Sequence, residues 1–452
     1  MSADWLWMTA ADLGRGIGAG AIDPVALTEA YLQAIRSHDL GDRIYARLTE
    51  DRALAEASAA AERAKAGLRR GLLDGVPVSW KDLFDTAGVA TEAGSALLAG
   101  RVPGTDAEVL RNATAAGLVC LGKTHMSELA FSGLGLNPVT ATPPCVNDAE
   151  AVPGGSSSGA AASVAFGLAP AGIGSDTGGS VRVPSAWNDL VGLKTTHGRV
   201  SSAGVVPLVE SFDTVGPLCR SVEDAGLLLA VLEGTKPADL GGASLKGARL
   251  MVLENVVLDD LREAPRQGFE RALAAFAEAG AVIERVAVPE LDEAMGFAGA
   301  TFGPEAWAIW RDVIRAAPEK MFDRIRERFE GGASVSAADH IAAWRRLRAL
   351  RRIWATRVAG YDAVLAPSCA ILPPKAARLL TDAEHYTTEN LLTLRNTRVA
   401  NLMGLPALTL PTGIPSTGIM LMGAPMGEES LLRTGLAAEA ALGIRRKSHN
   451  FA

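Results

Sequence analysis

Two serine-rich stretches and one lysine of this chain are the residue types that proteins use for acyl transfer. Residues 154–159 read GGSSSG, residues 176–180 read DTGGS, and Lys81 follows the apolar run GVPVSW. A serine hydroxyl is a poor nucleophile near neutral pH, so acyl transfer needs a neighbouring base and donors for the developing oxyanion. The question is whether GGSSSG is a flexible linker or part of a catalytic centre.

Ser180 has the oxyanion donors in its own flank. The adjacent glycines of DTGGS allow backbone conformations that other residues rarely adopt, so several N–H groups can converge on one point. The strand-like AGIGS comes before this turn and RVP follows it, which argues against a tether. The sequence therefore predicts that Ser180 lies on a structured turn.

The base can be a lysine, because burial lowers the pKa of the amine and its neutral form accepts a proton. Lys81 is the candidate, since Trp80 precedes it and Phe84 lies three residues further on. Taken alone, Lys81 is better explained as a lysine that ends a strand and points to solvent. The catalytic interpretation needs support from other residues.

Two other motif matches are weaker. Residues 117–124 fit the phosphate-loop pattern, but the four middle residues, LVCL, are typical of a buried strand. Residues 155–159 fit the GxSxG nucleophile elbow, yet no strand comes before them. None of the six histidines stands in a distinctive setting. A Ser-His-Asp hydrolase is thus the less favoured alternative.

The elements that must position these residues alternate between strands and helices. Helical patterns begin at Asp23-Pro24 and run again over residues 51–70. The later predicted helices cover residues 105–116, 264–279, 335–359 and 428–441, and the predicted strands are VPVSW, GLVCLG, LAPAGIGS, ARLMVLEN, AVIERVAV, YDAVLAP and LPALTLP. This alternation predicts an α/β fold with a central mixed sheet of many strands, flanked by helices on both faces.

The composition of the chain indicates which classes of ligand and partner it can bind. The net charge of −7 has no strong local concentration, so the chain lacks the basic surface of nucleic-acid-binding proteins, and a small soluble substrate is favoured. Four cysteines without CxxC pairing argue against a zinc site or a disulfide framework. The N-terminus is a poor signal peptide, so we expect a cytoplasmic protein. The uncharged residues 152–175 contain two prolines and many glycines, which favours protein interior over a membrane span.

These stretches together resemble the amidase signature family. GVPVSWKDLFDTAGVATEAGS is similar to the lysine segment of the family, and PGGSSSGAAASVAFGLAPAGIGSDTGGS to its serine-rich signature. The resemblance is nearly continuous from Asp23 to Ser221 and patchy afterwards. The intervals of 75 residues between Lys81 and Ser156 and of 24 between Ser156 and Ser180 match the usual spacing in the family.

The resemblance implies a Ser-cisSer-Lys triad. Ser180 matches the nucleophile that forms the acyl-enzyme, Ser156 the bridging serine in a cis peptide bond, and Lys81 the base. The implied oxyanion hole consists of the N–H groups of Thr177, Gly178, Gly179 and Ser180. We expect Ser157 and Ser158 to give hydrogen-bonding support, and Arg182 to be an internal partner of an acid such as Asp176.

The resemblance also implies the amidase signature fold as a single domain over residues 1–452, without a metal or an organic cofactor. Its parts are a helical layer (1–70), a catalytic core (71–235) and a C-terminal lobe that completes the sheet and supplies specificity (248–452). The chain departs from the family pattern around His125 and Ser127, where we expect Phe131 and Ser132 to border the substrate pocket. Trp310 or Phe302 could also recognise an aryl or alkyl group.

The implied activity is hydrolysis of a small carboxamide to a carboxylate and ammonia or an amine. An alternative is the glutamine-hydrolysing, ammonia-supplying component of a multi-subunit tRNA amidotransferase, which needs partner chains. The arginine and aspartate of its glutamine pocket have no assignable match here. A catalytically silent member is the third interpretation, and the complete set of lysine and serines argues against it. The expected partner is a small amide substrate. We expect no direct binding of nucleic acid and no membrane association, and a homodimer is possible.

Overall fold

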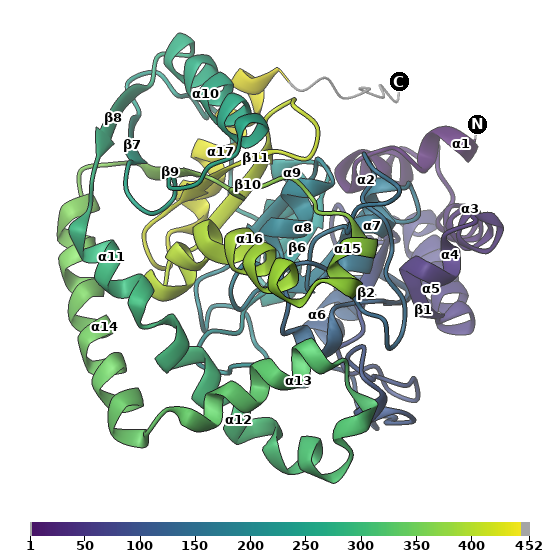
Figure 1. Ribbon diagram of the computed structural model, residues 1–452. Helices are drawn as coiled ribbons and strands as arrows, with labels where there is room; N and C mark the ends of the chain where they lie inside the picture. The colour runs from purple at the N-terminus through teal and green to yellow at the C-terminus, as the bar shows by residue number, and fades with distance from the viewer. Residues whose placement is uncertain (1, 444–452) are drawn as a thin grey trace.

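One mixed β-sheet of eleven strands runs through the computed structural model, which describes residues 2–443 (Figure 1). Met1 and residues 444–452, the end of the predicted C-terminal lobe, lie outside the described residues. The strands are β1 (Tyr45–Leu48), β2 (Pro77–Lys81), β3 (Val119–Thr124), β4 (Ala171–Ser175), β5 (Val191–Lys194), β6 (Val215–Cys219), β7 (Arg249–Leu253), β8 (Val282–Val286), β9 (Ala363–Pro367), β10 (Ala407–Pro411) and β11 (Gly418–Met422). Each of the three predicted parts of the chain contributes strands to this sheet, and the division into parts stays a prediction.

The sheet follows the order β1-β3-β2-β4-β6-β5-β10-β11-β9-β7-β8. Strand β2 pairs in parallel with β3 and β4, and β7 pairs in parallel with β8 and β9. The central strands from β4 to β9 pair antiparallel. Because β2 and β4 are parallel neighbours, Lys81 and Ser175 at their C-terminal ends lie at the same edge of the sheet.

Helices cover both faces of the sheet, which confirms the predicted fold class. One set, α9, α10 and α17, packs on β5, β6 and the strands from β9 to β11, and another set, α7 and α8, packs on β4, β5 and β10. The helices are α1 (Ser2–Trp5), α2 (Ala10–Gly18), α3 (Pro24–Ser37), α4 (Gly41–Ile44), α5 (Glu50–Lys65), α6 (Glu108–Ala115), α7 (Ser158–Ala165), α8 (Arg182–Trp187), α9 (Val222–Glu233), α10 (Glu263–Glu278), α11 (Pro289–Gly296), α12 (Ala298–Ala316), α13 (Asp323–Glu330), α14 (Ala337–Val358), α15 (Ala376–Thr381), α16 (Ala383–Met403) and α17 (Glu428–Leu442).

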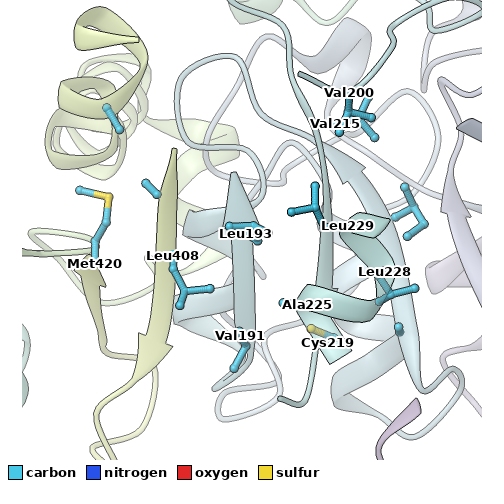
Figure 2. Packing of buried hydrophobic residues seen from close by; sticks show 14 of the residues in the cluster. Val191, Leu193, Val200, Val215, Cys219, Ala225, Leu228, Leu229, Leu408 and Met420 are labelled. Carbon is cyan, nitrogen blue, oxygen red and sulfur yellow. The ribbon is translucent and has the colours of Figure 1, made fainter. Parts of the chain in front are cut away.

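The hydrophobic core lies against the middle of the sheet. Figure 2 shows buried side chains around β5, β6 and α9, among them Val191, Leu193 and Leu228, which belong to one continuous cluster. All four cysteines are buried and free. No helix within residues 2–443 combines the length and apolar character needed to cross a membrane.

Small residues let α7 lie close against β4. A side chain at Gly172 of β4 would place its Cβ 2.9 Å from the carbonyl oxygen of Ala160 in α7. A Cβ at Gly174 would lie 2.6 Å from the Ser157 Oγ. This close approach is why the sequence between GGSSSG and DTGGS is rich in glycine and alanine.

Gly172→Val should therefore destabilise the protein. The added side chain would push α7 away from the sheet, and overpacking of this kind costs about 1–3 kcal/mol. Ile173→Val is the matched control at the next buried position of β4, where loss of one methylene costs about 0.5–1.5 kcal/mol. Urea unfolding measures both, and an unchanged midpoint for Gly172→Val would contradict the packing described here.

Candidate active site

Lys81 lies at the C-terminal end of β2 with its side chain fully buried. Its Nζ is 2.6 Å from the Ser156 Oγ and 2.8 Å from the Ser175 Oγ. The simpler interpretation of a lysine that points to solvent is therefore wrong. Every residue of β2 is buried because β2 lies between two parallel neighbours, and this position carries the amine into the protein interior.

The environment of Lys81 favours the neutral amine. Burial lowers the pKa of Lys81 to about 7, although the negative charges of Asp213 and Asp176 oppose this shift. Burial also raises the pKa of Asp213 to about 6, against the hydrogen bonds from Thr177 and two backbone N–H groups. The lysine can thus change its protonation state near neutral pH.

Ser156 is held in a tightly bonded loop. The Gly155–Ser156 peptide bond is cis. Backbone hydrogen bonds run from Gly155 N to the oxygen of Gly133 at 2.8 Å and from Ser127 N to the oxygen of Ser156 at 3.1 Å. The loop leads directly into α7, so GGSSSG is part of the buried interior and not a linker.

The two serines that follow have bonds of their own. Ser157 Oγ donates to the carbonyl oxygen of Ser175 at 3.3 Å, and Ser158 Oγ donates to that of His125 at 3.3 Å. Both side chains are buried and hold neighbouring backbone in place. This arrangement agrees with the supporting part expected of them.

The DTGGS turn is organised around the Asp176 carboxylate. Asp176 accepts hydrogen bonds from Gly179 N at 2.9 Å and Val181 N at 3.1 Å, and from the Arg182 Nε and Nη2 at 2.9 and 2.8 Å. Burial alone would raise the pKa of Asp176, but the charge and hydrogen bonds of Arg182 outweigh it and hold that pKa well below its ordinary value. Arg182 is therefore the internal partner of Asp176, as predicted.

Helix α16 fixes the turn from outside. Thr397 Oγ1 donates to the carbonyl oxygen of Gly178 at 2.7 Å, and Asn401 Nδ2 donates to Asp176 at 3.0 Å. Gly179 has a φ of +144° and lies so close to α16 that a Cβ would be 2.2 Å from the Thr397 Oγ1. Only glycine fits this position.

Ser180 lies at the end of the turn and borders a cavity of about 580 Å³. Its carbonyl oxygen accepts a hydrogen bond from Ser157 N at 3.3 Å, which places it next to the loop that carries Ser156. The Ser180 hydroxyl has no hydrogen-bond partner within residues 2–443, so the structure joins Lys81 to Ser156 but not Ser156 to Ser180. Ser180 is free to meet a ligand in the cavity.

The N–H groups of the turn fall into two kinds. That of Gly179 is already bonded to Asp176, whereas those of Thr177, Gly178 and Ser180 have no acceptor within the described part of the chain. Thr177, Gly178 and Ser180 all line the cavity. Within residues 2–443, these three N–H groups are donors without an acceptor at the edge of the cavity.

The predicted pocket residues Phe131 and Ser132 both line this cavity. The Phe131 ring packs 4.6 Å from that of Phe329, and Ser132 Oγ accepts a hydrogen bond from Tyr386 at 3.0 Å. Phe302 also lines the cavity, whereas Trp310 is buried and donates to the carbonyl oxygen of Pro207 at 2.9 Å.

Sequence reasoning missed Ser175, Asp213 and the arginines that face the cavity from α13 and α16. Ser175 is the last residue of AGIGS, and its position at a strand end beside that of Lys81 was a usable signal. Asp213 follows Ser-Phe in a stretch that the resemblance covered, but without the fold nothing placed it near the lysine. The helices α13 and α16 lie in the part of the chain where the resemblance was patchy.

Comparison with known proteins identifies the family. A glutamyl-tRNA(Gln) amidotransferase chain of Anaeromyxobacter sp. (strain K) is 34% identical, and the match covers 96% of both chains. The 2-amino-5-chloromuconic acid deaminase of Comamonas testosteroni is 36% identical over 89% of each chain. The solved peptide amidase of Stenotrophomonas maltophilia matches with a TM-score of 0.80 and 29% identity, over 98% of both chains.

The fold and these relatives define an enzyme that acts on the carbon–nitrogen bond of amides. The amidase profile matches residues 26–432. The chain therefore belongs to the amidase signature family, which confirms the resemblance drawn from its sequence.

The link between Asp213 and Lys81 can be tested by titration. Because the Asp213 charge raises the pKa of Lys81, Asp213→Asn should move that pKa from about 7 to a lower value. NMR titration of ¹³C-labelled lysine measures it, with Lys81→Met to assign the signal, since burial also lowers the pKa of Lys194 to about 7. An unchanged or higher Lys81 pKa in Asp213→Asn would contradict this electrostatic coupling.

Proposed function

We propose that this enzyme hydrolyses a small carboxamide to a carboxylate and ammonia or an amine through an acyl-enzyme on Ser180. The observation that carries the proposal is the contact between the buried amine of Lys81 and the hydroxyl of Ser156. A lysine with a pKa of about 7 is neutral often enough to act as a base at physiological pH. Ser180 lies beside this pair and borders the cavity.

In the proposed first step, the Ser180 Oγ attacks the amide carbon and its proton passes to the Ser156 Oγ. Ser156 gives its own proton to the neutral amine of Lys81, which becomes an ammonium. The electron pair of the carbonyl moves onto its oxygen. The free N–H groups of Thr177, Gly178 and Ser180 stabilise this oxyanion.

The tetrahedral species then collapses. The carbon–oxygen double bond re-forms, the carbon–nitrogen bond breaks, and the leaving nitrogen takes a proton that returns from Lys81 through Ser156. A water molecule next attacks the ester carbon and gives its proton to the same relay. The bond between the ester carbon and the Ser180 Oγ then breaks, and Ser180 takes the relayed proton back from Lys81 through Ser156. The product leaves as a carboxylic acid and loses its remaining proton to solvent.

A second candidate function is hydrolysis of glutamine as the ammonia-supplying component of a multi-subunit tRNA amidotransferase. The observation that favours it is the 34% identity to the Anaeromyxobacter amidotransferase chain over nearly the whole of both chains. This function requires partner chains, whereas the first does not. Similarity to the peptide amidase of Stenotrophomonas maltophilia, which extends over 98% of both chains, supports the first function.

Activity of the purified single chain separates the two functions. Ammonia release is measured with a panel of small amides and with glutamine. Turnover of an amide by the chain alone supports the amidase. Ammonia release from glutamine but from none of the small amides, and only after partner chains are added, would instead support the second function.

The role of Ser180 is tested in the same assay. Ser180→Ala should lower kcat by about a thousandfold or more, because the other hydroxyl of the turn, that of Thr177, is bonded to Asp213 and cannot take its place. Ser157→Ala is the matched control, since Ser157 holds backbone and does not line the cavity. Similar turnover by native protein and Ser180→Ala would show that the nucleophile has been misassigned.

A further inference from the structure

Three arginines line the cavity next to Ser180. Arg324 and Arg328 come from α13, and Arg398 comes from α16 (Figure 1). None of the three guanidinium groups makes a hydrogen bond or an ion pair with another residue in the range 2–443. The Arg324 Nε and one terminal nitrogen of Arg328 are buried without any partner. The cavity thus holds hydrogen-bond donors that nothing in the described part of the protein satisfies.

Other arginines of the same elements are paired with acids. Arg326 of α13 contacts Asp323 at 3.0 Å and does not line the cavity. The only acid that lines the cavity within the described residues is Glu327, and its side chain is exposed. The cavity therefore has a net positive charge.

Arg398 and Arg328 lie close to the DTGGS turn and to Phe131. The side chain of Arg398 lies beside the DTGGS turn, because a Cβ placed on Gly178 would be 3.8 Å from the Arg398 Cγ. Its neighbour Thr397 is bonded to the carbonyl oxygen of Gly178. The Arg328 guanidinium lies over the ring of Phe131 at 4.4 Å. The arginines therefore occupy the same small space as the reacting amide of the proposed function.

The charges around the cavity favour an anionic ligand. Burial, together with the nearby positive charge of Arg328, lowers the pKa of Arg398 to about 9. Burial also lowers the pKa of Arg328. Two like charges that have lost part of their hydration, with no acid between them, gain most from an anionic ligand.

The remaining polar groups complete a site for an anion. Ser132 Oγ donates to the Asn390 Oδ1 at 3.2 Å, and Gly133 N donates to the same oxygen at 2.9 Å. The Asn390 Nδ2 has no partner among the described residues and is left as a donor to the cavity. A planar guanidinium group binds a carboxylate through two paired hydrogen bonds. The arginines therefore suit a carboxylate better than an anion whose charge lies at a single point.

We propose that the substrate carries a carboxylate in addition to the amide that is cleaved, and that Arg328 and Arg398 bind this carboxylate. Arg324 adds positive charge to the same wall. The proposal rests on the proposed amidase function and names its substrate class as the monoamides of dicarboxylic acids. A zwitterionic amide such as glutamine fits less well, because its ammonium group would face three arginines and the single exposed carboxylate of Glu327.

Matched pairs of substrates test this specificity on the native enzyme. Succinamate, glutaramate and adipamate are compared with butyramide, valeramide and hexanamide, which have the same chain lengths without the carboxylate. The best monoamide should have a kcat/KM at least about 100-fold above that of its neutral counterpart. Equal kcat/KM within each pair, or faster hydrolysis of glutamine than of glutaramate, would overturn the proposal.

Variants then test the arginines. Arg328→Gln and Arg398→Gln should each bring the ratio between carboxylated and neutral substrates toward one, chiefly by raising the KM of the carboxylated amide. Arg398→Lys should restore part of the preference, because it restores the charge. Arg326→Gln is the matched control on α13 and should keep the native ratio. A native ratio in both Arg328→Gln and Arg398→Gln would overturn the assignment of the carboxylate site.

Binding of a dicarboxylate tests the carboxylate site independently of the proposed amidase activity. Calorimetric titration with glutarate, a dicarboxylate without an amide, needs no turnover. We expect native protein and Ser180→Ala to bind glutarate alike, and Arg398→Gln to bind it at least about tenfold more weakly. If no amide is hydrolysed but glutarate binds in this way, the amidase function fails while the anion site stands. If amides are hydrolysed but glutarate binds native protein and Arg398→Gln equally, the anion site fails alone.

Discussion

The buried ion pair between Asp176 and Arg182 is the interaction on which the rest of the site depends. Both side chains are completely buried, and such a pair is tolerated only when its hydrogen bonds are satisfied. Here the carboxylate also binds two N–H groups of the turn and Asn401 of α16, and Arg182 binds the carbonyl oxygen of Thr397 at 2.6 Å. The pair therefore joins the glycine-rich turn to a helix more than two hundred residues away in the chain. Removing either partner would leave a buried charge alone and release the turn that carries Ser180.

The same constraint explains how the site controls charge. Asp176 is paired with Arg182, and burial keeps the pKa of the nearby Lys81 at about 7 although the charge of Asp176 raises it. On the side of the cavity, the opposite arrangement holds, because the three cavity arginines of α13 and α16 have no acid partner within residues 2–443. The charges of the DTGGS turn are thus paired within the protein, whereas the positive charges of the cavity arginines can be paired by an anionic ligand. This difference connects the proposed chemistry of the turn with the proposed choice of substrate.

The sequence predicted the fold class, because the alternation of strands and helices depends on local patterns, whereas the catalytic roles of Lys81, Ser156 and Ser180 stay predictions. All the apolar runs named as strands are strands, and the structure brings Lys81 and Ser156 into contact. Strands β1, β5, β6 and β11 escaped prediction because YARL, VGLK, VGPLC and GIMLM are short runs that contain a charged residue, a glycine or a proline. Asp213 and Arg398 escaped as well, since their importance depends on which distant segment each one faces. Long-range packing of this kind leaves no periodic signal in the chain.

The most direct test is to identify which residue becomes covalently modified, because Ser180, on the turn held by Asp176 and Arg182, should be the nucleophile. The protein is treated with a fluorophosphonate, digested, and the modified peptide is mapped by mass spectrometry. We expect a single adduct on Ser180 in native protein and none in Ser180→Ala. An adduct on Ser156 or Ser157, or labelling that persists in Ser180→Ala, would contradict it.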